Sequence, residues 1–117
     1  MVTYEFNRES RLLTPGQFQS VFSNPIRYGS SHITVLVIPN SNNNRLGLAI
    51  AKKRIKLAVQ RNRIKRQIRN SFRLNQHKLP NIDMVVMVKS GTDKLENNDI
   101  NQQLEKIWRK IIQRHKS

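Results

Sequence analysis

The sequence predicts an α+β fold in one small domain, with a sheet of roughly four strands packed against three helices. Three observations lead to this prediction. The chain has 117 residues, which is enough for a single modest hydrophobic core. Apolar and β-branched runs typical of strands occupy 31–38, 45–53 and 84–88. Apolar residues recur at helical spacing over 58–75 and 98–114.

A short helix is predicted first, over 15–23. Thr14 is a suitable N-cap and Gln17 completes a capping box, in which each residue's side chain bonds the other's backbone N–H. Leu13 and Phe18 are spaced as a hydrophobic staple around this cap. Residues 1–13 are expected to be an extended segment of the single domain that spans 1–117.

The next two strands are predicted to form an antiparallel hairpin around the Asn-rich turn 39–44, with a further short strand near 27–30. The second strand of this hairpin has leucines on one face and small residues on the other: Gly47, Ala49 and Ala51. Either a partner approaches the sheet closely at this face or a helix packs tightly there. The run 84–88 is continuously apolar, as expected of a strand covered on both faces.

The helix over 58–75 is predicted to be amphipathic and strongly basic. Ile64, Ile68 and Phe72 are spaced four apart, so they form an apolar line on one side. Ten of the 22 residues in 52–73 are Lys or Arg and none is acidic. One side of this helix can therefore dock on the core while the other presents cations to a partner.

The sequence also predicts the position of Arg61 and the cap of the last helix. Arg61 falls within the apolar arc of the basic helix, so we expect it at the edge of the sheet rather than on the outer surface. The last helix, over 98–114, is expected to be capped by Asn98 or Asp99.

The net charge of +15 is extreme for this length, and no carboxylate occurs over 10–82. Such a block repels itself and is relieved by a polyanion. A nucleic acid is the leading partner, because phosphate contacts release counterions. A membrane surface is the weaker alternative, since no long apolar run or lipidation signal is present. Without cysteine there is no disulfide and no thiolate zinc site, and we expect a cytoplasmic protein.

No catalytic or metal-binding residue is predicted in the protein. Metal-dependent phosphodiester cleavage needs clustered carboxylates, and the few acids lie near the two ends of the chain. The sequence shows no Gly-rich phosphate loop, and no nucleophile beside a recognisable base. The three histidines, which lie far apart, are His32, His77 and His115.

Among the nucleic acids, RNA is favoured as the partner. Arginine suits bidentate contacts to phosphate, and aromatic side chains beside a positive groove can stack unpaired bases. Phe18 and Phe22 lie on one side of the first helix and Tyr28 follows it. The alternative is that the two phenylalanines belong to the core.

The segment Arg61-Asn62-Arg63-Ile64-Lys65-Arg66 closely resembles the RNR-x-KR signature of the protein subunit of bacterial ribonuclease P. RNR alone would be a weak signal, but the resemblance covers nearly the whole chain. The further matching segments are RLLTPGQFQSVF over 11–22, Arg45-x-Gly47-Leu48, Ala51-Lys52-Lys53, Ile68-Arg69-x-x-Phe72-Arg73, Asp83-x-Val85-Val86 and Leu104-x-x-x-Trp108.

The resemblance implies an RNA-binding subunit of an endoribonuclease that removes the 5′ leader from precursor tRNA. Its partners would be the ribonuclease P RNA subunit and precursor tRNA, with neither a membrane nor DNA. Mg²⁺ would be held mainly by the RNA subunit, where catalysis would occur. The basic helix would lie in a left-handed βαβ crossover, against the usual hand, in a fold like the second domain of ribosomal protein S5.

The resemblance also assigns residues. Those expected to face the RNA subunit are Arg61, Asn62, Arg63, Lys65, Arg66, Arg69 and Arg73. Those expected to line a cleft for the leader are Phe18, Phe22, Lys52 and Lys53. Arg61 and Asn62 are expected at the join of these two surfaces.

Some positions depart from the family pattern. Asn70 stands where Glu is common, Leu36 is aliphatic where some members have an aromatic residue, and 54–56 replaces a glycine-containing linker. Leader stacking is therefore expected to depend more on Phe18, Phe22 or Tyr28.

Two other classes of function share some of these features. A ribosomal or other structural RNA-binding protein shares the charge and fold class, although the RNR-x-KR signature argues against it. A helix-turn-helix DNA regulator is disfavoured, because the strands before the basic helix leave no room for its first helix.

Overall fold

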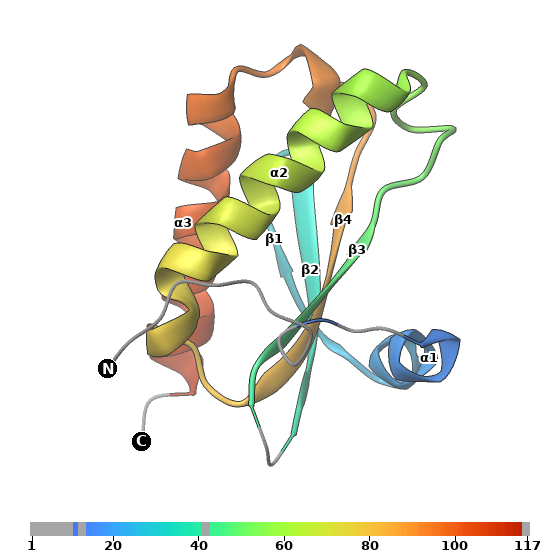
Figure 1. Cartoon of the computed structure of the whole chain (residues 1–117). Coiled ribbons are helices and arrows are strands. Elements are labelled where there is room, and N and C mark those ends of the chain that lie inside the picture. Colours follow the sequence, from blue (N-terminus) through green and yellow to red (C-terminus); the bar gives the residue numbers. More distant parts are fainter. Residues whose placement is uncertain (1–10, 12–13, 41–42, 116–117) are drawn as a thin grey trace.

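The computed structural model describes residues 11, 14–40 and 43–115, and confirms the α+β fold with a four-stranded mixed sheet and three α-helices (Figure 1). The helices are α1 (Pro15–Ser23), α2 (Ala58–Asn75) and α3 (Asn97–Arg114). The strands are β1 (Ile26–Gly29), β2 (Ile33–Pro39), β3 (Arg45–Ala49) and β4 (Ile82–Val88). Short 3₁₀ helices are η2 (Gln76–Lys78) and η3 (Thr92–Lys94). None of these helices is long and apolar enough to cross a membrane.

The strand order is β1-β2-β4-β3, so the predicted hairpin between β2 and β3 is wrong. β4 lies between them, antiparallel to β2 and parallel to β3. Every residue of β4 except Met87 is buried. A strand of this kind has to be covered on both faces and paired at both edges, which is possible only in the centre of the sheet. β3, α2 and β4 form the expected crossover between parallel neighbours, while its left-handed sense stays a prediction. The short strand expected near 27–30 is confirmed as β1, at the other edge.

α1 begins at the predicted capping box. The backbone N–H of Gln17 donates to Thr14 Oγ1 at 3.2 Å, and that of Thr14 donates to Gln17 Oε1 at 3.1 Å. Such a cap contributes about 0.5–2 kcal/mol, which matters for a helix of nine residues. Leu13 lies outside the described residues, so the staple with Phe18 stays a prediction.

The two faces of the sheet are covered unequally (Figure 1). On one face, α2 and α3 bury the large core, to which β2 contributes Ile33, Val35 and Val37. On the other face, α1 covers a smaller cluster of Val21, Leu36 and Val85. Leu36 is 3% exposed beneath α1, so its aliphatic character fills this cluster. Part of the second face is left open beyond α1.

α2 is anchored by its predicted apolar line. Ile64, Ile68 and Phe72 are fully buried, and the Phe72 ring meets the Trp108 ring edge-on at 6.5 Å between centroids. The Trp108 indole N–H also donates to Ser71 Oγ at 2.8 Å. These contacts fix the rotation of α2, so its basic side faces outward.

The predicted cap of α3 is wrong. The N-cap is Glu96, one residue before the helix begins at Asn97, and its side chain makes no capping hydrogen bond. Neither Asn98 nor Asp99 occupies that position, and both are exposed within the first turn. The Asn97 side-chain oxygen instead accepts from Arg63 of α2 at 2.6 Å, so a contact between helices determines this end.

An ion pair joins β3 to β4 on the face opposite α2. Arg45 donates from Nε and Nη2 to the two carboxylate oxygens of Asp83, both at 2.7 Å, and Asn40 donates to the same carboxylate at 2.6 Å. These hydrogen bonds to Asp83 raise the pKa of Arg45. Because Asp83 is nearly buried, the pair fixes the start of both parallel strands.

Tyr28 lies on the face of the sheet opposite to α1 and its two phenylalanines. It packs in the large core beneath α3, across the sheet from α1, and is 7% exposed. Its hydroxyl is buried without a hydrogen-bond partner among the described residues. Burial raises the pKa of Tyr28 above 10.0, and the nearby Arg114 partly offsets this.

Replacing Tyr28 with phenylalanine is expected to stabilise the fold by about 1 kcal/mol, because an unsatisfied buried hydroxyl carries a desolvation cost. Because the pKa of the Tyr28 phenol is raised in the folded state, ionisation of this phenol favours unfolding. The native protein therefore keeps its full stability below pH 10.0 and loses stability as the pH rises through the folded-state pKa. The advantage of the Tyr28→Phe protein should therefore grow between about pH 8 and about pH 11 in urea unfolding. Parallel stability curves over this range would contradict the prediction.

Candidate nucleic-acid interface

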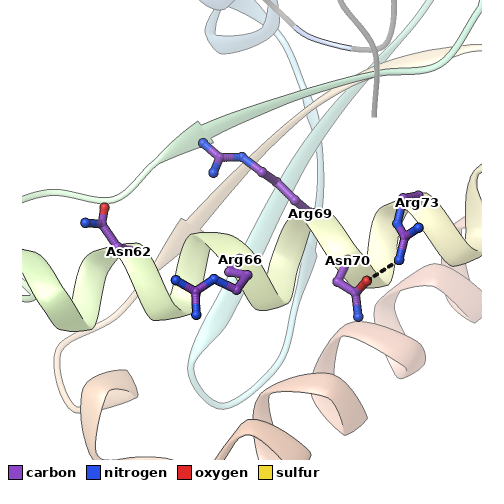
Figure 2. Close-up of a pocket in the computed structure, with 5 residues that line it drawn as sticks. All are labelled: Asn62, Arg66, Arg69, Asn70 and Arg73. Atoms are coloured by element: carbon purple, nitrogen blue, oxygen red, sulfur yellow. Dashed lines mark hydrogen bonds between the residues drawn. The ribbon is translucent and has the colours of Figure 1, made fainter. Parts of the chain in front are cut away.

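A positively charged groove runs along the outer side of α2. Its lining residues are Asn62, Arg66, Arg69, Asn70 and Arg73, which surround a hollow of about 450 Å³ (Figure 2). Their spacing along the helix places them on one broad stripe opposite the buried apolar line. The lining contains three guanidinium groups and no carboxylate, so the groove suits phosphate.

Asn70 and Arg73 are coupled within this groove. Arg73 Nη2 donates to Asn70 Oδ1 at 2.6 Å, the contact drawn in Figure 2. An amide at position 70 accepts this hydrogen bond without neutralising the arginine. The departure from Glu at this position therefore leaves the groove with its full positive charge.

Arg69 connects the α2 groove to a second hollow at the β3 edge of the sheet. The second hollow, of about 190 Å³, is lined by Arg11, Phe18, Leu46, Gly47, Leu48, Lys65 and Arg69. Figure 2 shows the Arg69 side chain extending from α2 toward β3, while Arg66 points to another side of the helix. Arg69 is thus the residue that lines both hollows, whereas Asn62 lines only the α2 groove and Arg61 lines neither. The join expected at Arg61 and Asn62 stays a prediction.

Arg61 bonds to its own chain. Its Nη1 donates to the carbonyl oxygens of Ile55 at 2.9 Å and Lys56 at 2.8 Å, and the side chain is half-buried. It therefore closes the loop that leads into α2. This contact explains why an arginine falls within the apolar arc, as the sequence indicated.

Arg63 also has partners within the chain. It donates to Gln60 Oε1 at 2.9 Å, Asn97 Oδ1 at 2.6 Å and the Asp93 carbonyl at 3.0 Å. These bonds tie the first half of α2 to η3 and the start of α3. Of the RNR triplet, Asn62 alone lines the α2 groove.

A third hollow of about 560 Å³ lies on the face of the sheet that α1 leaves partly open. Its lining residues are Thr34, Ala49, Ala51, Arg54, Met87, Val88, Lys89 and Ser90. Ala49 and Ala51 border this hollow, although Ala49 also packs against the small cluster beneath α1. Close approach by a partner at this small-residue face stays a prediction.

The residues expected to line the leader cleft are only partly brought together. Phe18 is half-buried against the α1 cluster and lines the second hollow, whereas Phe22 is 45% exposed. Lys52 and Lys53 do not end a strand as predicted. β3 stops at Ala49, and both lysines are exposed in the turn that follows, outside the three hollows described above.

The loop between β3 and α2 contains two residues whose roles the sequence did not reveal. Ile55 is fully buried in the large core, which anchors this loop without the glycine common in the family. Its neighbour Arg54 is exposed and lines the third hollow, opposite Lys89 at the end of β4. The single apolar residue between two basic ones in 54–56 was the available signal in the sequence.

Two polar side chains of types that can carry catalysis, His32 and Glu105, have partners within the chain. His32 Nδ1 lies 3.2 Å from Gln103 Nε2, and the Gln103 side-chain oxygen accepts from the His32 backbone N–H at 2.9 Å. Glu105 accepts from Asn75 at 3.2 Å. Within the described residues, no three His, Asp or Glu side chains converge on a metal-sized site.

Comparisons with known proteins agree on one family. The family model described as Ribonuclease P matches residues 6–112. The *Staphylococcus aureus* RNase P protein is 24% identical and has a TM-score of 0.82, over 88% of this chain and 97% of that one. A mutant of that protein with defective mRNA degradation activity gives the same identity and TM-score over 87% of both chains. The *Thermotoga maritima* RNase P protein is 24% identical with a TM-score of 0.76, over 86% and 96% of the two chains.

At these identities the solved structures show a shared fold, and the family model extends the likeness to sequence over most of the chain. The match sets aside the alternatives of a ribosomal protein and of a DNA regulator. The chain belongs to the ribonuclease P family, as a protein subunit of the bacterial type with a role in processing the 5′ end of tRNA.

Proposed function

We propose that this protein binds the ribonuclease P RNA through the α2 groove and the 5′ leader of precursor tRNA through the opposite face of the sheet. The observation that carries this proposal is the presence of two separate hollows with cationic linings, the α2 groove and the hollow on the open face of the sheet. Arg69 lines both the α2 groove and a smaller hollow at the β3 edge. Each side has its own chemistry, one made of guanidinium groups on α2 and the other of small residues on the sheet beside the phenylalanines of α1.

The α2 groove suits a folded RNA backbone. Arg66 and Arg69 are exposed and Arg73 is oriented by Asn70, so guanidinium groups lie along one helix face without competing carboxylates. Guanidinium pairs with phosphate in a bidentate geometry, which gives orientation as well as affinity. Arg61 and Arg63 act in this proposal as positioning residues, because their hydrogen bonds to the chain hold α2 in place.

The open face of the sheet suits a single strand. Ala49 and Ala51 allow the strand to approach closely, while Arg54 and Lys89 offer charge to its phosphates. Phe22, with 45% of its surface exposed, is available to stack on a base, and Phe18 supplies an apolar wall at the β3 edge. Lys52 and Lys53, exposed in the adjacent turn, extend this cationic surface.

Phosphodiester cleavage is proposed to occur in the RNA subunit, with Mg²⁺ held mainly by RNA. The ion would stabilise the charge that develops on the reacting phosphate. The described acidic side chains do not form a ligand set for it, since Asp83 pairs with Arg45 and no cluster of three is present. The protein's part is to neutralise phosphates, so that the two RNAs approach one another at lower divalent ion concentration.

Reconstitution with the RNA subunit and a precursor tRNA at low Mg²⁺ tests this proposal. The protein should stimulate 5′-leader cleavage, and stimulation should fall in the Arg66→Gln/Arg69→Gln protein. The matched control Lys78→Gln/Lys94→Gln removes the same charge from exposed positions outside the α2 groove and should retain stimulation. Cleavage that does not depend on the protein would overturn the proposal.

A further inference from the structure

A fourth cationic hollow lies between β1 and the second half of α3. It measures about 610 Å³ and is lined by Arg27, Tyr28, Arg109, Lys110, Gln113 and Arg114. Among the described residues, none of its four cations forms an ion pair. None of the residues that the proposed function gives to the RNA subunit or to the leader lines it.

The charge pattern of α3 differs from that of an ordinary solvated helix. Its acidic residues, Asp99 and Glu105, lie in the first half, while the second half has only cations. A solvated face more often alternates its signs. The helix dipole favours a cation at the C-terminus but acts only within the last turn. It therefore accounts for Arg114 and leaves Arg109 unexplained. Arg27 lies on β1, outside the reach of this effect.

The position of this hollow indicates its partner. It lies at the β1 edge of the sheet, whereas the hollow that Arg69 shares with β3 lies at the opposite edge. α2 and α3 form one layer on the same face of the sheet, and the leader surface is on the other face (Figure 1). The molecule is only 37 Å in its longest dimension, so a large RNA that engages α2 can reach this hollow along the same layer.

We propose that the hollow between β1 and α3 is a second binding site for the phosphate backbone of the ribonuclease P RNA. The cations of α3 neutralise phosphates, and the Tyr28 side forms an apolar wall against the ribose and base. This proposal rests on the proposed function, because it takes the same RNA as the occupant of a separate site. In it, the protein holds that RNA at two edges of the sheet rather than along α2 alone.

The Lys110→Gln/Arg114→Gln protein tests the site, because both residues are exposed and glutamine is a good helix former. Its affinity for the isolated RNA subunit should fall about tenfold, and the slope of log affinity against log salt should become shallower by about 1.5. The Arg109→Gln protein gives an independent measure that leaves the last helical turn intact. The Lys78→Gln/Lys94→Gln protein, with the same net charge, should keep near-native affinity and salt dependence.

The second measurement is the affinity of the same variants for precursor tRNA in the absence of the RNA subunit. Melting temperatures confirm that each variant folds. A loss confined to precursor tRNA would overturn the assignment to the RNA subunit. Equal losses in the site and control proteins would reveal a general charge effect, and unchanged affinity in both site variants would show that the hollow is not used. If Arg66→Ala has no effect while these variants do, the α2 assignment fails and this site stands.

Discussion

Arg66→Ala should weaken binding to the ribonuclease P RNA about tenfold or more while the melting temperature stays close to that of the native protein. Arg66 is exposed in the α2 groove, and the residues that hold α2 on the core, including Ile64 and Phe72, are fully buried. A hydrogen bond to a charged group contributes about 1.5–3 kcal/mol, and an exposed substitution changes stability by about 0.5 kcal/mol or less. Fluorescence anisotropy with labelled RNA and a thermal melt measure the two quantities.

Arg63→Ala is the matched comparison on the same helix. It removes hydrogen bonds to Gln60, Asn97 and the Asp93 carbonyl, so we expect a stability loss of about 1–3 kcal/mol. If Arg66→Ala instead lowers the melting temperature strongly and leaves RNA affinity unchanged, the two faces of α2 have been assigned the wrong way round.

Trp108→Ala should cost about 3–5 kcal/mol of unfolding free energy, the largest loss that we expect from a single core substitution. Trp108 is fully buried, packs edge-on against Phe72, and donates its indole N–H to Ser71. Because small domains have only about 5–15 kcal/mol in total, the variant should unfold at much lower urea concentration.

Trp108→Phe is the control for this substitution. It keeps most of the aromatic volume but loses the hydrogen bond to Ser71, so its loss should be smaller than that of alanine. A loss below about 1 kcal/mol in Trp108→Ala would contradict the view that this residue fixes α2 on α3.

Local signals in the sequence predicted the elements closely. The capping box at Thr14 and Gln17 and the apolar line of Ile64, Ile68 and Phe72 each depend on residues within one or two helical turns. The bounds of α1 and α2 follow from them and agree with the structure. The absence of carboxylates over 10–82 likewise indicated a polyanionic partner directly.

Contacts between segments that are distant in the chain could not be predicted from the sequence. No local pattern shows that β4 inserts between β2 and β3. Strand order depends on which strand has to be buried in the centre of the sheet, and this is decided by all strands and helices together. The same limit applies to Tyr28, whose face of the sheet follows from the register of β1 with β2. The turn at Lys52 and Lys53 is set by burial of Ile55, three and two residues further on.

The sequence alone therefore determined that this protein has a small α+β fold and a basic helix with one apolar side, and it predicted an RNA partner of the ribonuclease P type. The tertiary structure decided which cations are available to that partner. The sequence set Arg61 apart by its place in the apolar arc, but it gave no sign that Arg63 differs from Arg66 and Arg69. In the structure both Arg61 and Arg63 bond to acceptors of their own chain. A guanidinium group is committed or available according to the acceptors that folding brings within about 3 Å of it, and the sequence does not list those neighbours.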